Sequence, residues 1–190
     1  MITVNFENVN EAGANNSEYA KPPAGGYLCV IEEVENKEKS NGIVLCLDID
    51  EGEYAGYFTD KYNHFGWWAL TSFHSYKPKA LPFFKRLLKN LEVSNPIIDF
   101  ALDGGSIQLN ESDLVGLRIG VVFGYEEYIG NDGKVKEKTK VADVISLDDL
   151  RNGKYKVPEK VTLPKPAEAI GVTNKAATTF EPVSDDDCIF

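Results

Sequence analysis

The sequence has few of the features that mark secreted, membrane-spanning or metal-binding proteins. It contains three cysteines and two histidines among 190 residues, and Cys29, Cys46 and Cys188 lack the spacing of metal ligands. An odd number of cysteines cannot pair fully within one chain, so a reducing cytoplasm is the expected setting. The longest apolar runs, such as residues 42–47, are far shorter than the roughly 20 residues of a membrane span. The N-terminus has no basic, apolar leader, and no signal peptide is expected.

Motifs of several common enzyme classes are also missing. The chain has no Walker loop, no Gly-x-Gly-x-x-Gly motif, no Gly-x-Ser-x-Gly motif and no cysteine in a catalytic context. His64 and His74 have no cysteine or carboxylate at the spacing of a zinc site. The acidic run at residues 48–53 would suit Mg²⁺ in a nuclease, but a solvated turn explains it better. We therefore expect no catalytic activity and no cofactor.

The charge of the chain is distributed unevenly. A formal net charge of −10 at first argues against nucleic acid as a ligand, because nucleic-acid-binding proteins are normally basic. Residues 1–60 and 161–190 are acidic, whereas residues 61–160 carry 15 bases against 13 acids. Electrostatic screening limits the reach of a charge to about 8 Å at physiological salt. A local basic surface therefore binds anions even when the net charge is negative.

Basic residues gather in three stretches of the central region. The alternative for each stretch is an ordinary solvated strand or helix face. The stretches are Lys77, Lys79, Lys85, Arg86 and Lys89; Lys134, Lys136, Lys138 and Lys140; and Arg151, Lys154, Lys156 and Lys160.

The hydrophobic pattern predicts mainly strands. We expect strands at about 27–34, 43–50, 54–62, 117–128 and 134–146, with turns at Asn41-Gly42 and Asp132-Gly133. In the second strand, alternate residues such as Ile43 and Leu45 share one face. The one convincing helix is 79–92, where Leu81, Phe84, Leu88 and Leu91 form an apolar stripe. Ser146 is expected to cap a short helical turn.

Three strands, one helix and two strands are the element order of an OB-fold. We therefore predict an all-β fold, a five-stranded Greek-key barrel with one helix between strands 3 and 4. Residues 1–25 are predicted to form an irregular arm and residues 26–158 the OB-fold domain. Residues 159–190, which are rich in Pro, Ala and Thr, are predicted to form a flexible acidic tail.

Aromatic residues gather between residues 54 and 76, next to several lysines. Proteins that bind single strands without sequence preference need rings for unstacked bases and cations for phosphates. About half of these rings are expected in the core instead, because large aromatic side chains usually fill cores. Trp67 and Trp68 are adjacent, so at most one is expected to stack on a ligand. The candidate nucleic-acid-binding residues are Tyr57, Lys61, Tyr62, Phe65, Trp67, Trp68, Tyr76, Lys77, Lys79, Arg86, Lys89, Arg118, Tyr125, Tyr128, Lys134, Lys136, Lys138 and Lys140.

The C-terminal residues combine acids with an apolar tip. Three aspartates precede Cys-Ile-Phe, a chemistry that suits capture by an apolar, basic-rimmed pocket on a partner, whereas a generic acidic tail would have no need of apolar residues. The candidate partner-binding residues are Asp185, Asp186, Asp187, Ile189 and Phe190.

This tip resembles that of bacterial single-stranded DNA-binding proteins, which ends in three aspartates, Ile-Pro and Phe. Asp185, Asp186, Asp187 and Phe190 match by position, and Cys188 and Ile189 replace the Ile-Pro pair. Residues 26–158 are similar instead to single-stranded DNA-binding proteins of phages that infect low-GC Gram-positive bacteria. The resemblance rests on segments 26–28, 63–68, 84–91, 130–134 and 148–154.

The resemblance implies an OB-type barrel that protects phage single-stranded DNA in the cytoplasm of the infected bacterium. It implies recruitment of phage or host replication and recombination proteins through the tip, with the acidic tail competing for the DNA groove. Because OB proteins of this type often pair, a homodimer is a further expectation. The alternatives are an acidic β-barrel interaction protein, such as a DNA mimic or phage adaptor, and, less favoured, a metal-dependent nuclease.

Overall fold

Five antiparallel strands hydrogen-bond in the order β3-β2-β1-β4-β5 in the computed structural model, which describes residues 21–164. This order and pairing are consistent with an all-β, OB-like fold. The strands are β1 (Gly25–Lys37), β2 (Gly42–Ile49), β3 (Thr71–Ser75), β4 (Arg118–Ile129) and β5 (Val135–Ile145).

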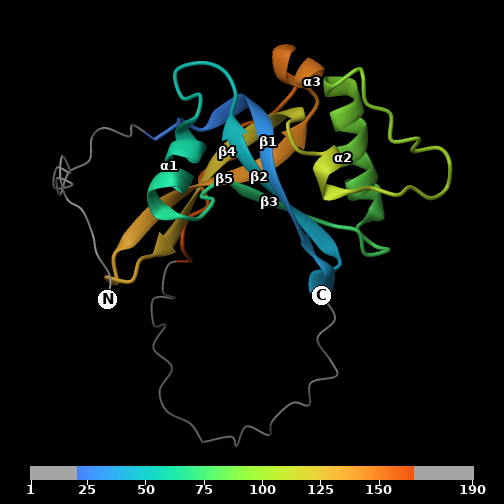
Figure 1. Cartoon of the computed structure of the whole chain (residues 1–190). Coiled ribbons are helices and arrows are strands. Elements are labelled where there is room, and N and C mark those ends of the chain that lie inside the picture. Colours follow the sequence, from blue (N-terminus) through green and yellow to red (C-terminus); the bar gives the residue numbers. More distant parts are fainter. Residues whose placement is uncertain (1–20, 165–190) are drawn as a thin grey trace, which may run out of the picture.

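Three helices accompany the sheet. Helix α1 (Tyr57–Phe65) lies between β2 and β3 in the sequence, α2 (Leu81–Ser94) precedes β4, and α3 (Leu147–Arg151) follows β5. Short 3₁₀ turns occupy Glu38–Ser40 and Glu111–Asp113. In Figure 1, α1 lies to the left of the strands and α2 to the right, and the β1–β2 and β4–β5 hairpins diverge below them. Both helices contribute buried side chains to one hydrophobic core. None of the helices in residues 21–164 is long and apolar enough to cross a bilayer.

The two edge strands, β3 and β5, face each other across a narrow crevice. Ser72 and His74 of β3 and Asp143 of β5 line this space of about 170 Å³ together with α2. Helix α2 bridges the crevice, because Arg86 pairs with Asp143 at 3.0 Å. Within residues 21–164 no strand pairing joins β3 to β5.

Several elements confirm the sequence predictions. Helix α2 occupies the predicted segment and buries Phe84, Leu88 and Leu91, although Leu81 stays half exposed. Asn41 adopts the left-handed conformation expected of the Asn-Gly turn. The Ser146 side chain accepts a hydrogen bond from the backbone N–H of Asp149 and so caps α3.

The predicted third strand was wrong, as was the expectation of a single helix. Residues 57–65 form helix α1, and the third strand lies at 71–75, after the segment predicted as a strand. Gly56, whose φ of 78° is easy only for glycine, turns the chain immediately before α1. The apolar content of 54–62 was typical of a strand, but tertiary contacts decide the conformation.

The main tertiary contact to α1 is made by Asp48 of β2. Its Oδ1 accepts hydrogen bonds from the backbone N–H groups of Ile49 at 2.7 Å and Phe58 at 2.9 Å, and Oδ2 accepts from Thr59 at 3.0 Å. The carboxylate is 2% exposed. It satisfies N–H groups that a helix N-terminus cannot pair internally, and its charge suits the positive end of the helix dipole. Asp48 is therefore fully engaged in the fold and does not project into solvent as a Mg²⁺ ligand.

Helix α1 also contributes to the aromatic part of the core. Phe58 meets the edge of Phe123, whose ring stacks on Tyr27 at a centroid distance of 4.5 Å. Phe58 and Phe123 are almost completely buried. Two contacts therefore position the start of α1: Asp48 accepts hydrogen bonds from its backbone, and Phe123 packs against its Phe58 side chain.

The chain after β5 folds back over the outer side of β1 and β4. The returning chain can pack closely on this side because two positions beneath it are glycines, which have no side chain. A Cβ atom on Gly26 would lie 2.6 Å from Tyr155, and one on Gly124 would lie 2.7 Å from Pro158. Val161 then forms an isolated bridge with Glu126 of β4. This segment covers the outer side of β4 and of β1 near Gly26, whereas Glu33 in the second half of β1 and Phe73 in β3 are exposed.

Replacing Asp48 by Asn should lower the free energy of unfolding by about 2–3 kcal/mol, because backbone N–H groups at a helix start lose a charged acceptor. Urea denaturation followed by circular dichroism measures the change. Asp60→Asn is the matched control, since it removes the same charge from an exposed position on α1 and should change stability by less than about 0.5 kcal/mol. Equal stabilities of the two variants would contradict the role of Asp48.

Candidate functional site

The outer side of β1, β2 and β3 is defined by the strand register. Ile43, Leu45 and Leu47 belong to the core, so the alternate residues of β2 point outward. Two rows of cross-strand partners form the outer side: Glu35, Val44 and Phe73, and Glu33, Cys46 and Thr71. Small apolar side chains thus lie in the middle of this surface, with carboxylates on one flank and a ring on the other.

Phe73 is the ring on the β3 flank. It is 52% exposed and lies over Gly42, where an added Cβ atom would be only 2.5 Å from the ring. The glycine therefore serves two purposes, since it follows the Asn41 turn and leaves room for Phe73. The sequence prediction missed Phe73 because the strand around it, Thr-Ser-Phe-His-Ser, is otherwise polar.

Trp68 is held beside the β1 flank. Its indole Nε1–H donates a hydrogen bond of 2.8 Å to Glu33 Oε2, and its ring stacks on Tyr62 with a centroid distance of 4.6 Å and an interplanar angle of 18°. Both rings are half-buried. Glu33, which the sequence prediction also missed, therefore fixes the orientation of one of the two tryptophans.

Phe65 and Trp67 occupy the turn between α1 and β3 and are more open to solvent. They are 57% and 59% exposed, and their ring centroids lie 6.3 Å apart. Gly66, with a φ of 73°, ends α1 between them. Exposed Trp67 and half-buried Trp68 thus have different environments, as expected for adjacent residues. We call Tyr62, Phe65, Trp67, Trp68 and Phe73 the aromatic face.

Two other predicted rings lie elsewhere. Tyr57 is buried in the core, with Lys61 Nζ 4.5 Å from its ring centroid. Tyr76 packs edge-on against Phe84 and donates to Asn36 Oδ1 at 3.3 Å. Neither ring belongs to the aromatic face.

The two tyrosine rings of the β4–β5 hairpin differ in how accessible they are to a ligand. The Tyr125 hydroxyl donates to the Pro22 carbonyl at 2.9 Å, and Lys21 Nζ lies 3.6 Å from its ring centroid, so one side of this ring is occupied. Tyr128 is 39% exposed, with Lys138 Nζ 5.9 Å from its ring centroid. Tyr128 is therefore the ring of this hairpin that is more accessible to a ligand.

The lysines of the hairpin outnumber their partners. Lys138 and Lys140 share Glu126, at 3.3 and 3.5 Å, and Lys136 pairs with Asp132 at 3.2 Å. Hydrogen bonding to Lys138 lowers the pKa of Glu126, which therefore stays charged. Lys134 has no ion pair with any residue in 21–164. Glu127 and Glu137 of the hairpin pair with Lys160, and Glu137 also pairs with Lys21. Counting Lys21 and Lys160, this region has six lysines against four carboxylates and keeps excess positive charge.

The basic residues around α2 fall into two groups. Arg86 pairs with Asp143 at 3.0 Å and Arg118 with Asp50 at 2.7 Å, so both are partly neutralised. The second group is exposed and makes no ion pair within the described part of the chain. It consists of Lys77, Lys79 and Lys89.

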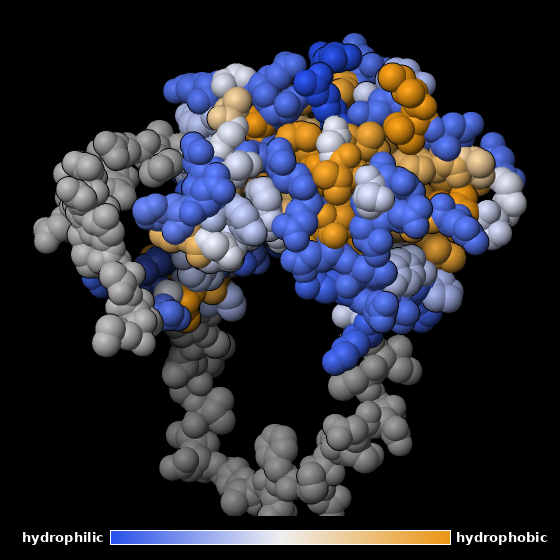
Figure 2. Space-filling model, in the orientation of Figure 1, coloured by the Kyte–Doolittle hydropathy of each residue, from blue (hydrophilic) through white to orange (hydrophobic). Residues whose placement is uncertain are grey.

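The surface is indented between the two hairpins. Figure 2 shows this hollow at the lower edge of the view, with the end of the β4–β5 hairpin on the left and the β1–β2 hairpin on the right. In Figure 1, α1 ends beside the same space and β3 starts near it. The turn that carries Phe65 and Trp67 joins those two elements.

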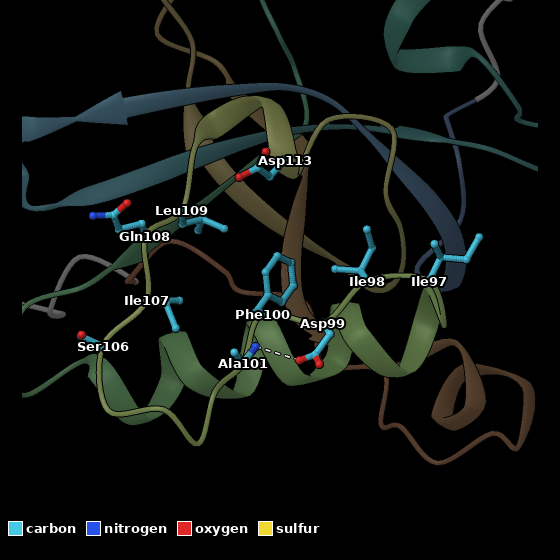
Figure 3. A pocket seen from close by; sticks show the side chains of 10 residues that line it. All are labelled: Ile97, Ile98, Asp99, Phe100, Ala101, Ser106, Ile107, Gln108, Leu109 and Asp113. Atoms are coloured by element: carbon cyan, nitrogen blue, oxygen red, sulfur yellow. Dashed lines mark hydrogen bonds between the residues drawn. The ribbon is translucent and has the colours of Figure 1, made fainter.

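Two cavities lie away from the aromatic face. A groove of about 1080 Å³ runs between α2 and residues 102–114 and is lined mostly by apolar side chains, including Leu81 and Leu109. A second pocket of about 550 Å³ lies within the loop that follows α2. Figure 3 shows its lining, with the Ala101 N–H bonded to Asp99 at 2.8 Å. Its charged lining residues, Asp99 and Asp113, are both acids, which suits it poorly to phosphate.

His74 lies in the crevice between β3 and β5. Burial, with a smaller contribution from Arg86, lowers the pKa of His74 to about 4, and its ring is hydrogen-bonded to Ser72. No group of three His, Cys, Asp or Glu within residues 21–164 is arranged to hold a metal ion. The predicted partner-binding residues 185–190 lie outside the described residues.

A comparison of the sequence with protein-family models and with curated proteins finds no match.

Cys46 provides a test of the outer side. It is fully buried although it points away from the core, and this burial, with Glu33 and Glu35, raises the pKa of its thiol to about 12. Burial also raises the pKa of Cys29. With Cys188 replaced by Ser, the native protein should therefore show no rapid reaction with a thiol reagent at pH 8, because only thiolate reacts.

The measurement is the release of nitrothiobenzoate from Ellman's reagent before and after denaturation. Two thiols should react after denaturation. Rapid reaction of one thiol in the native protein would contradict the burial of Cys46 on the outer side.

Proposed function

We propose that the protein binds single-stranded DNA without sequence-specific contacts and without catalysis. The observation that carries the proposal is the aromatic face, five rings gathered on and beside the outer side of an OB-like sheet. Three of the five rings, Phe65, Trp67 and Phe73, are more than half exposed, and a group of large exposed apolar side chains often marks a binding surface. In OB-folds, this sheet surface and its flanking loops bind oligonucleotides.

Base stacking supplies the attraction in this proposal. Every nucleobase has a π-face, and stacking on an aromatic side chain contributes about 1–3 kcal/mol per base. Trp67 and Phe73 are each more than half exposed, whereas Tyr62 and Trp68 are already stacked on each other. The exposed rings therefore receive unstacked bases, and the Tyr62–Trp68 pair supports the surface beneath them.

Phosphates are neutralised beside the rings. Lys77 and Lys79 follow directly after β3, and the lysines in and beside the β4–β5 hairpin, with Lys21 and Lys160 included, outnumber its carboxylates. Salt-sensitive binding follows, because neutralising phosphates releases counterions. In this proposal the strand order completes a Greek-key barrel across the β3–β5 crevice, and the β4–β5 hairpin flanks the bound strand.

The resemblance of the tip suggests the biological setting. We place the protein in a phage replication or recombination system, acting in the cytoplasm of the infected host. Residues 185–190 recruit replication or recombination proteins, with the aspartates pairing with basic side chains and Phe190 filling an apolar pocket.

An acidic interaction protein is the rival function, favoured by the carboxylates on β1. Glu33 and Glu35 lie on the same outer surface as the rings. A DNA mimic would block a DNA-binding protein and would never retard single strands in an electrophoretic assay. A protein that binds single-stranded DNA would retard them itself.

Trp67→Ala should weaken binding of a mixed-sequence single-stranded oligonucleotide by about 1–3 kcal/mol, since it removes one stacking ring. Fluorescence anisotropy of a labelled oligonucleotide measures the dissociation constant at low and high salt. Phe83→Ala is the matched control, because Phe83 is a 66% exposed ring on α2. It lines the β3–β5 crevice beside Ser72 and His74, whose side chains alternate with that of Phe73 along β3.

The affinity of the wild type for the oligonucleotide should fall steeply with salt. The Phe83→Ala variant should have the same dissociation constants as the wild type. Equal effects of the two substitutions would contradict binding at the aromatic face. The absence of wild-type binding would contradict the function itself.

A further inference from the structure

The carboxylates of β1 determine whether the bases or the phosphates of a bound nucleic acid lie next to β1. Glu33 and Glu35 lie in successive rows of the outer side, and Lys37 pairs only with Glu35. A phosphate placed beside Glu33 would meet an unneutralised like charge. The strand must therefore run with its phosphates toward the lysines beyond β3 and in the β4–β5 hairpin, and with its base edges toward β1.

Glu33 is oriented for contact with those base edges. Its Oε2 accepts the indole N–H of Trp68 at 2.8 Å, which fixes the carboxylate against the edge of the ring pair. Within residues 21–164, its Oε1 has no hydrogen-bond partner. The side chain is exposed, so a ligand has access to this oxygen.

A carboxylate oxygen only accepts hydrogen bonds, so it distinguishes bases by their donors. Cytosine and adenine present an exocyclic amino group, and guanine presents donors as well. Thymine presents carbonyl oxygens on both sides of its single N–H, which places partial negative charges against the carboxylate.

From this arrangement we infer that Glu33 is a specificity-determining residue that favours amino-bearing bases over thymine at the aromatic face. The inference rests on the proposed function and adds a base preference to binding that is otherwise tolerant of sequence. Trp68 acts as a positioning residue, because its N–H holds the Glu33 carboxylate in place.

The test compares oligo(dC) with oligo(dT) of equal length, by anisotropy at one salt concentration and at pH 8, where cytosine is unprotonated. Wild type should bind oligo(dC) more tightly by on the order of 5-fold, the lower end expected for a polar contact to a base edge. Glu33→Gln should bring the ratio close to one, mainly by strengthening oligo(dT) binding.

Glu32→Gln is the matched control, because Glu32 is the neighbouring exposed acid at the register shift in β1 and has no cross-strand partner there. It removes the same charge and should leave the ratio unchanged. Trp68→Phe keeps a ring but removes the N–H that holds Glu33, and should reduce the ratio while oligo(dC) binding persists.

A dC-to-dT ratio that is lost in Glu33→Gln and kept in Glu32→Gln supports the inference. Tight wild-type binding with a ratio of one or below, or with a ratio unaffected by Glu33→Gln, overturns the inference and leaves the proposed function standing. No binding of either oligonucleotide by wild type overturns both.

Discussion

The carboxylate of Asp48 is the interaction on which the rest of the site depends. One buried side chain on β2 accepts three backbone hydrogen bonds, two of them from the first turn of α1. A buried charge is tolerated only when such bonds replace its hydration. Because α1 starts at this anchor and at buried Phe58, Tyr62 in its last turns is placed against Trp68, whose indole donates to Glu33 on the outer side of the sheet.

The aromatic face combines features that are usually separate. Its rings suit stacking, yet its β1 flank is acidic, and the free lysines lie beyond β3 and in the β4–β5 hairpin. A net charge of −10 therefore says little about the field at this surface, since charges more than about 8 Å apart are largely screened. Under the proposed function, this division of charge gives the strand a direction across the surface, with bases on the side of Glu33 and phosphates on the side of Lys77.

The accuracy of sequence prediction varied from element to element for physical reasons. The stripe of α2 and the alternation of Ile43 and Leu45 were predicted correctly, because an amphipathic pattern has one stable way to face a core. Residues 54–62 were predicted as a strand and form the start of α1, since their apolar content suits either structure and Asp48 decides between them. Trp68 was predicted to belong to the site, but its partner Glu33 was not.

The sequence by itself determined which segments are amphipathic, where Asn41 turns the chain and where the rings and lysines are concentrated, because these properties depend on residues close together along the chain. Only the tertiary structure decided which rings are buried, as Tyr57 is, and which stay open, as Trp67 does. It also decided that a carboxylate 35 residues away orients Trp68. Such contacts depend on strand register and on the path of the chain between strands, which local patterns do not encode.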